Sequence, residues 1–450
     1  MAHRHAMLYR YGYGGSIGRP GQHSQHEYGY RESPPPAINR VDMSPRYMPA
    51  DMNTPSLSDI TRAAPAQDDD RGFTRYFRRQ AVKGLSPRLM TNVLSGDNNV
   101  STIRFVLALM VLWSHSFAFY FDDEKREPIA LLMRGLYNAG NVGVACFLIM
   151  SGALVLRSWE TSRSVGSFVV KRAKRLYPAY IIAVFVGAFV VAPIYAGIDP
   201  FSLLRRDFGE WLAANIVFRG YAPVDHVFVH SPISVINGSL WSIGYEVICY
   251  IALMIGAAVL RHRLVTGCWA MMVVLTGAKV FADLTGWNPG FGIIGAILGW
   301  PYLWFSVAGW FMTGMLFYLH RDAIPRHRGL VAAIGLGWAA MIWLPSDLMA
   351  ARILMDVFYT PMLAYVLFYL CSKPRLAVEK TARTHDLSYG MYLYAFPIQQ
   401  IILAEFGHGL AFPAYVGLSA LCTLVASLAS WTWIEKRFVS AKPVRPAKPA

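Results

Sequence analysis

The sequence is poor in charged residues. Asp, Glu, Lys and Arg make up 15% of its 450 residues, whereas about a quarter is usual in soluble domains. It has no Walker loop, dinucleotide-binding fingerprint, GxSxG elbow or zinc-ligand motif. Its five cysteines stand singly in or beside apolar segments, so they predict neither a disulfide framework nor a metal site. We therefore expect no metal and no bound cofactor, and chemistry carried by His, Glu, Arg and hydroxyl groups.

Apolar and aromatic residues are abundant instead, at 55% and 14% of the chain. This composition predicts an all-α, polytopic membrane protein. The net charge of +15 does not indicate nucleic acid, because the basic residues fall between apolar runs. We predict about ten transmembrane helices, near residues 102–121, 139–157, 178–198, 239–260, 265–284, 299–319, 329–345, 352–371, 387–406 and 412–433.

The two ends differ from this apolar part. Residues 1–95 have no apolar run or sustained periodicity, which predicts a disordered region, with an interfacial helix expected at 71–90. Residues 98–437 form the predicted membrane domain, and 438–450 a basic tail. Lys and Arg are concentrated in alternate loops. By the positive-inside rule, this predicts a multi-pass protein of the inner (plasma) membrane with both termini in the cytoplasm.

The first predicted span contains two ionisable residues, Arg104 and His115. Eleven residues of helix amount to about 20° more than three full turns, so both lie on one face, roughly 16 Å apart along the axis. Ionisable groups within a span mark a functional interior by default. The alternatives are an Arg that snorkels to the interface and a neutral His that is hydrogen-bonded to a neighbouring helix.

Arg172 and Arg175 precede the third predicted span. Three residues apart on a helical turn, they present two guanidinium groups on one side. This geometry suits the phosphates of a donor such as coenzyme A, which Arg binds through two parallel hydrogen bonds. The alternative is a basic anchor at the cytoplasmic interface.

The fourth predicted span carries a polar stripe at helical spacing, formed by Ser239, Ser242, Glu246 and Tyr250. A carboxylate at this depth needs a partner. We expect His115, Arg104 or hydroxyl groups of another helix to meet Glu246. Beside His115 it would orient the imidazole; otherwise it forms a structural bond between helices.

Three further patterns are weaker. The small residues between Gly143 and Gly152 predict close helix packing. Arg352 and Asp356 have the i,i+4 spacing of a local ion pair. The ninth predicted span places Ser388, Tyr392 and Gln399 on one face.

Together these motifs resemble acyltransferase family 3, the integral-membrane acyltransferases that include O-antigen, exopolysaccharide and Nod-factor O-acetyltransferases. Five motifs occur in the family's order over residues 98–437. They are Arg104 with His115, Gly143 to Gly152, Arg172 and Arg175 leading to Pro178, Trp241 to Tyr250, and Ser388 to Pro397. One position departs from the pattern: Ala395 stands where many members have a His in the ninth span.

The resemblance implies a membrane O-acyltransferase. The expected donor is cytoplasmic acyl-CoA, with acetyl as the expected acyl group, and the expected acceptor is a hydroxyl of a cell-envelope or exported glycan or glycolipid. It implies two catalytic residues, His115 as general base and Glu246 as the group that orients or polarises the site. The implied substrate-binding residues are Arg104, Arg172, Arg175, Ser242, Tyr250 and Tyr392. The alternative function is a transporter or flippase for a glycolipid or small molecule.

Overall fold

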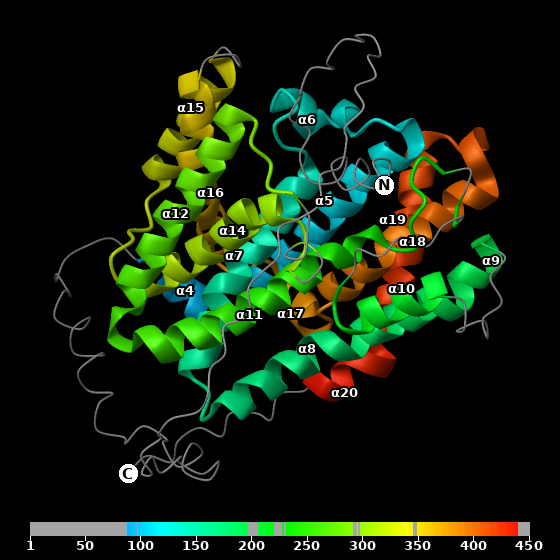
Figure 1. The fold of residues 1–450 in the computed structure, drawn as a ribbon, viewed down its shortest axis with the longest axis horizontal. Helices are drawn as coiled ribbons and strands as arrows, with labels where there is room; N and C mark the ends of the chain where they lie inside the picture. The colour runs from blue at the N-terminus through cyan, green and yellow to red at the C-terminus, as the bar shows by residue number, and fades with distance from the viewer. Residues whose placement is uncertain are drawn as a thin grey trace, which may run out of the picture. The chain divides into compact units, whose positions relative to one another are not determined.

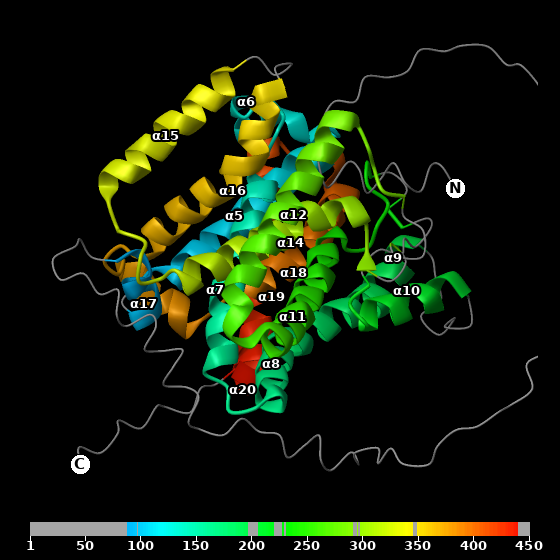
Figure 2. The ribbon, with the colours of Figure 1, turned by 60° about the vertical axis from the view of Figure 1, so that its left-hand side comes forward.

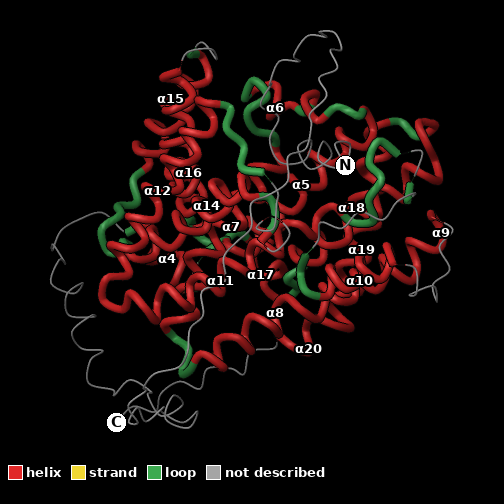
Figure 3. Tube along the Cα trace, in the orientation of Figure 1, coloured by secondary structure: helices red, strands yellow, loops and turns green. Residues whose placement is uncertain are grey.

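The computed structural model describes residues 88–96, 98–196, 206–219, 227–228, 231–290, 295, 298–344 and 349–439. Helices account for nearly all of these residues, and no strand occurs among them (Figure 3). The all-α prediction is confirmed. The predictions for 1–87, including most of the interfacial helix at 71–90, and for the tail from 440 onward lie outside the described residues.

The part of the chain that the structure describes is built mainly from ten long helices, most of which Figure 1 labels. They are α5 (Val100–Phe121), α7 (Ala139–Glu160), α8 (Val165–Val186), α11 (Trp241–Leu260), α12 (Leu264–Thr285), α14 (Pro301–Leu319), α15 (Arg328–Trp343), α16 (Met349–Cys371), α18 (Ser388–Phe406) and α19 (Phe412–Ser430). The shorter helices are α4 (Leu89–Ser95), α6 (Pro128–Leu132), α9 (Ala192–Ala196), α10 (Arg206–Ile216), α17 (Ala377–Thr384) and α20 (Lys436–Val439).

Each predicted span overlaps one of the long helices, but the structure does not confirm the count of ten. Within the described ranges, 7 helical stretches are long and apolar enough to cross a membrane. One of them, Gly238–Thr285, contains both α11 and α12, which a short 3-10 turn joins. The 16-residue helix α15 is apolar but shorter; it lies at the margin and packs on α16 (Figure 2).

Two helix boundaries differ from those of the predicted segments. The third span was expected to begin at residue 178, but α8 begins at Val165, where the Ser164 side chain accepts a hydrogen bond from the Ser167 amide. Pro178 lies within this helix, as membrane helices tolerate when neighbouring groups satisfy the backbone. Arg172 and Arg175 are therefore helical residues of α8.

The second boundary concerns the end of the predicted disordered region. Residues 89–95 form α4, and its Leu89, Met90 and Val93 are almost completely buried. The Leu89 amide also donates a hydrogen bond of 3.0 Å to the Ile324 carbonyl. These apolar residues occur at i, i+1 and i+4, which is a helical spacing. The pattern is too short to be recognised as a helix after the long polar sequence that precedes it.

Helix α7 is central, because it packs against both α5 and α14. At its crossing with α14, a Cβ on Gly152 would overlap the carbonyl oxygen of Phe311, and a Cβ on Gly314 would overlap that of Ile149. The two backbones touch because neither glycine has a side chain. The packing predicted from the small residues of 143–152 is therefore confirmed at Gly152.

Candidate active site

Two cavities lie among the helices around α7. The larger, here called the arginine cavity, has a volume of about 130 Å³, and its polar lining comes from Arg104, Ser151, Arg172, Arg175, Ser242, Glu246, Tyr250, Ser388, Tyr389 and Tyr392. The smaller, here called the histidine cavity, has a volume of about 30 Å³. Its polar lining includes Ser114, His115, Glu124, Asn138, Asn141, Ser306 and Tyr392.

The structure therefore brings seven of the eight predicted site residues to one cavity. The eighth, His115, lines only the other cavity, and Tyr392 lines both. The seven come from α5, α8, α11 and α18, which are far apart in the sequence. Their convergence supports a shared site, whereas separate structural roles would not require it.

The sequence analysis missed Asp386, which lies between α17 and α18. Its Oδ2 accepts hydrogen bonds from Arg104 Nη1 at 3.1 Å and from Arg175 Nη2 at 2.7 Å. The Ser388 hydroxyl donates to its other oxygen at 2.7 Å. Burial alone would raise the pKa of Asp386, but the two Arg charges and the Ser388 hydrogen bonds outweigh it and hold the pKa well below its usual range.

A second acidic residue, Glu435, reaches the same place from the end of the chain. Helices α8 and α20 lie side by side (Figure 1), and this brings Glu435, just before α20, to 3.9 Å from Arg175 Nη1. Arg175 is thus held by two carboxylates. By contrast, Nε of Arg172 is buried and has no hydrogen-bond partner among the described residues.

Glu246 is held by hydroxyl groups. Its Oε1 accepts a hydrogen bond of 2.5 Å from Ser151 on α7 and one of 2.6 Å from Tyr250 on its own helix. The expected partners of Glu246 were His115, Arg104 or a hydroxyl group of another helix, and the structure shows the last of these. The hydrogen bond between α7 and α11 fixes the carboxylate at the wall of the arginine cavity.

His115 has a mainly aromatic environment. Its ring packs edge-on against Phe396, with centroids 5.3 Å apart, and against Phe119 at 6.2 Å. Its Nδ1 is buried without a hydrogen-bond partner in the described part of the chain. The imidazole and Glu246 line different cavities, so the predicted orientation of His115 by Glu246 is not seen.

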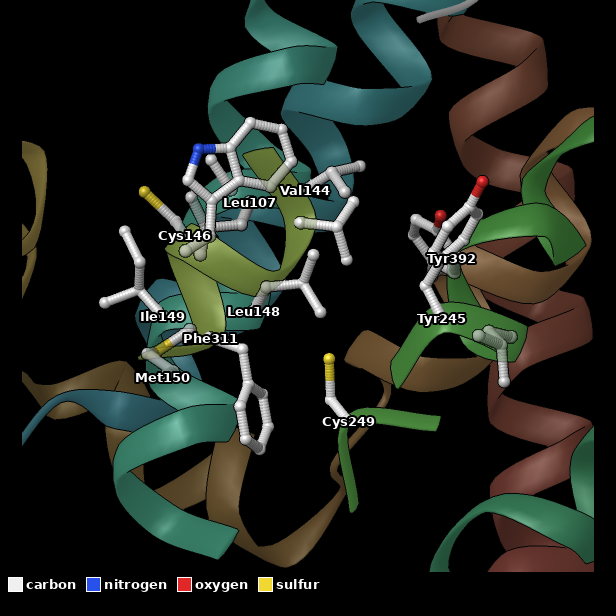
Figure 4. Packing of buried hydrophobic residues seen from close by; sticks show 14 of the residues in the cluster. Leu107, Val144, Cys146, Leu148, Ile149, Met150, Tyr245, Cys249, Phe311 and Tyr392 are labelled. Carbon is white, nitrogen blue, oxygen red and sulfur yellow. The ribbon is translucent and has the colours of Figure 1, made fainter. Parts of the chain in front are cut away.

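Tyr392 is where the two cavities adjoin, because it lines both. Its hydroxyl lies 2.5 Å from that of Ser242, and either can be the donor. Figure 4 shows Tyr392 on the opposite side of the view from Val144 and Leu148 of α7. Ala395, one turn further along α18, is completely buried and lines neither cavity.

The fold and the cavity thus define a helical membrane protein with a buried site of arginine, hydroxyl and carboxylate groups. Among the described residues, no group of three His, Cys, Asp or Glu side chains is arranged to hold a metal ion. The sequence profile of an acyltransferase domain, acyltransferase family 3, matches residues 97–431. The chain therefore belongs to this family, and acyl transfer is its class of reaction.

Two curated proteins are similar over most of their length. An O-acetyl transferase of Shigella phage Sf6 is 28% identical over 356 residues, which cover 76% of this chain and 96% of that protein. Nodulation protein 10 of Rhizobium leguminosarum bv. viciae is 26% identical over 362 residues, 75% of this chain and 92% of that protein. No solved structure matches the chain.

Proposed function

We propose that the protein is an O-acyltransferase of the inner membrane. It moves an acyl group, acetyl by similarity to the phage enzyme, from cytoplasmic acyl-CoA to a hydroxyl of a cell-envelope or exported glycan or glycolipid. The arginine cavity is the observation that carries this proposal. It combines cationic groups suited to phosphates with a pocket that has an apolar wall and several hydroxyl groups.

The size of the arginine cavity suits the reacting end of such a donor. An apolar cavity of about 150 Å³ holds one benzene molecule, so the 130 Å³ here suits an acyl thioester and excludes a nucleotide. The nucleotide and its phosphates would then remain at the mouth of the cavity. Arg172 is suited to bind a phosphate there because its Nε is without a partner among the described residues.

Arg104 and Arg175 play a different part in this proposal. Asp386 already binds both guanidinium groups, so they keep only part of their capacity for an anion. They hold the mouth of the cavity open and positive, and Arg172 makes the main contact with phosphate. Ser242, Glu246 and Tyr250 also line this cavity, and the thioester would lie against them.

His115 is the proposed general base. A neutral imidazole nitrogen can accept a proton, and Nδ1 of His115 lacks a hydrogen-bond partner among the described residues. The histidine cavity, of about 30 Å³, has room for a hydroxyl group or one or two waters. The acceptor hydroxyl would enter there, give its proton to His115, and attack the thioester carbonyl.

The test uses the full-length protein in membranes, with acetyl-CoA and a cell-envelope glycan fraction. Free CoA thiol is followed by colorimetry, and glycan acylation by mass spectrometry. The wild type should release thiol and acylate the glycan together, and His115→Gln should do neither. Absence of both products with the wild type, or full activity of the His115 variant, would refute the proposal.

The donor contact has a matched control on the same helix. Arg172→Ala should raise the donor KM by about tenfold or more, since one charge-assisted hydrogen bond contributes about 1.5–3 kcal/mol. Lys174→Ala removes a neighbouring positive charge whose residue is exposed and should leave KM unchanged. Equal donor KM values for the two variants would contradict the role of Arg172.

A further inference from the structure

The two cavities lie one after the other along the same helices and share a boundary. Helix α5 contributes Arg104 to the arginine cavity and His115 to the histidine cavity, and α7 contributes Ser151 and Asn141 in the same way. The two residues on α5 are separated by about 16 Å of helix. A donor in one cavity and an acceptor in the other must therefore meet between them.

Two described residues, Val144 and Tyr392, line both cavities. The Val144 side chain is a hydrocarbon, so the Tyr392 hydroxyl is the only polar side-chain group of this pair. Tyr392 is buried, with 8% of its surface exposed. A hydrogen bond from a buried donor is stronger than one made in water, so this hydroxyl has the greatest effect on charge that develops at the boundary.

We propose that Tyr392 is a catalytic residue that donates a hydrogen bond to the acyl carbonyl oxygen during transfer. The inference rests on the proposed function, which places a thioester on one side of this residue and a hydroxyl on the other. Ser242 completes the arrangement. When its hydroxyl donates to Tyr392 across the 2.5 Å contact, the phenolic hydrogen is free to point at the substrate, and accepting that bond makes the phenol a better donor.

The step balances as follows. The acceptor O–H gives its proton to His115 while its oxygen forms a bond to the thioester carbonyl carbon. The electron pair of the C=O bond moves to the carbonyl oxygen, which becomes an oxyanion bound by the Tyr392 hydroxyl. When the C=O bond re-forms, the C–S bond breaks, and the thiolate takes the proton from His115 to leave as a thiol.

The test is Tyr392→Phe, which removes the hydroxyl and keeps the ring. Loss of one oxyanion donor lowers kcat by about 10²–10³-fold in other enzymes, and we expect a fall of that order with the donor KM within about threefold of wild type. The control is Tyr415→Phe. Tyr415 is also fully buried and donates one hydrogen bond, to the Gln399 carbonyl, but it lines neither cavity. Its kcat should stay within threefold of wild type.

Ser242→Ala provides a second measurement that leaves the phenol in place. Its kcat should fall by about two- to tenfold, the usual effect of one neutral hydrogen bond. Unchanged kcat in Tyr392→Phe, or a change confined to the donor KM, would overturn the inference. If Tyr392→Phe does not fold, unchanged kcat in Ser242→Ala would overturn it. Failure of the proposed function is distinct, because the wild type itself would then release no thiol from acetyl-CoA.

Discussion

Replacing Asp386 with Asn tests how the mouth of the arginine cavity is held together. The substitution keeps the shape of the side chain but removes the negative charge that Arg104 and Arg175 share. Both contacts are short, at 3.1 and 2.7 Å, and the three side chains are only 16–23% exposed. Two positive groups would remain close to each other in a poorly hydrated place, where an unpaired charge is strongly destabilising.

The magnitude follows from these contacts. Each charge-assisted hydrogen bond contributes about 1.5–3 kcal/mol, and Asn retains one acceptor oxygen, so about half of the total is lost. Without the carboxylate, the two arginines repel each other, which increases the loss of stability. Partial access to water weakens this repulsion. We expect Asp386→Asn to lower the free energy of unfolding by about 2–4 kcal/mol.

The assay is reversible unfolding in mixed detergent micelles, followed by tryptophan fluorescence. Asp322→Asn is the matched control, because Asp322 also pairs with an arginine, Arg88 at 3.3 Å, but with its side chain 50% exposed. A pair as exposed as this contributes about 0–1 kcal/mol. Equal losses in the two variants, within about 0.5 kcal/mol, would refute the reasoning.

Three more predictions follow from the packing and the charges. Gly152→Val should lower the yield of folded protein and destabilise it by about 1–3 kcal/mol or more, because a Cβ there meets the Phe311 carbonyl; size-exclusion chromatography of detergent extracts measures this. Lys279→Met should cost about 3–5 kcal/mol of unfolding free energy, since Lys279 lies 2.5 Å from Asp283 and 2.8 Å from Asp356. The stability difference between the wild type and Asp386→Asn should not shrink between about pH 8 and pH 5, and should shrink only below about pH 4. A carboxyl whose pKa folding lowers, as here, stabilises the fold above its unfolded pKa and loses this effect as pH falls through its folded pKa.

Each of these predictions has a control. A Cβ on Gly309 of α14 meets no atom within 4 Å, so Gly309→Ala should be tolerated, and equal damage from both glycine variants would contradict the packing argument. The double variant Lys279→Met with Asp356→Leu should recover part of the lost stability. It removes one of the two carboxylates that lose their Lys279 partner in the single variant. If the stability difference between the wild type and Asp386→Asn falls steadily between pH 8 and pH 5, this would contradict the low pKa of Asp386.

The sequence was sufficient to predict the long helices and most of the polar residues that line the arginine cavity. Apolar runs separated by basic loops placed each long helix, and helical spacing picked out polar residues that face one cavity. The start of α8 was missed because a single capping residue, Ser164, sets it within a polar stretch. Such a local signal has no effect on hydropathy.

The contact partners of the predicted residues were harder to identify from the sequence. Asp386 is an isolated acid beside a basic loop, and only the packing of α5, α8 and α18 brings it to two arginines. Asp356 is an example of a spacing that misled: the i,i+4 pattern pointed to Arg352, whereas the structure pairs the carboxylate with Lys279 of α12. Contacts between distant helices depend on tertiary structure, so one chain's local pattern cannot identify them.

The pairing of Arg104 with Asp386 also has a consequence for biosynthesis. The two residues are 282 positions apart, and at about 5–20 residues per second the ribosome makes the second about 15–55 s after the first. During that interval the first helix carries a guanidinium without its counter-ion. Arg104 therefore has to stay near the interface, where its long side chain reaches water, until α18 arrives. The arginine cavity is complete only after α18 has been made, because Ser388, Tyr389 and Tyr392 are part of its lining.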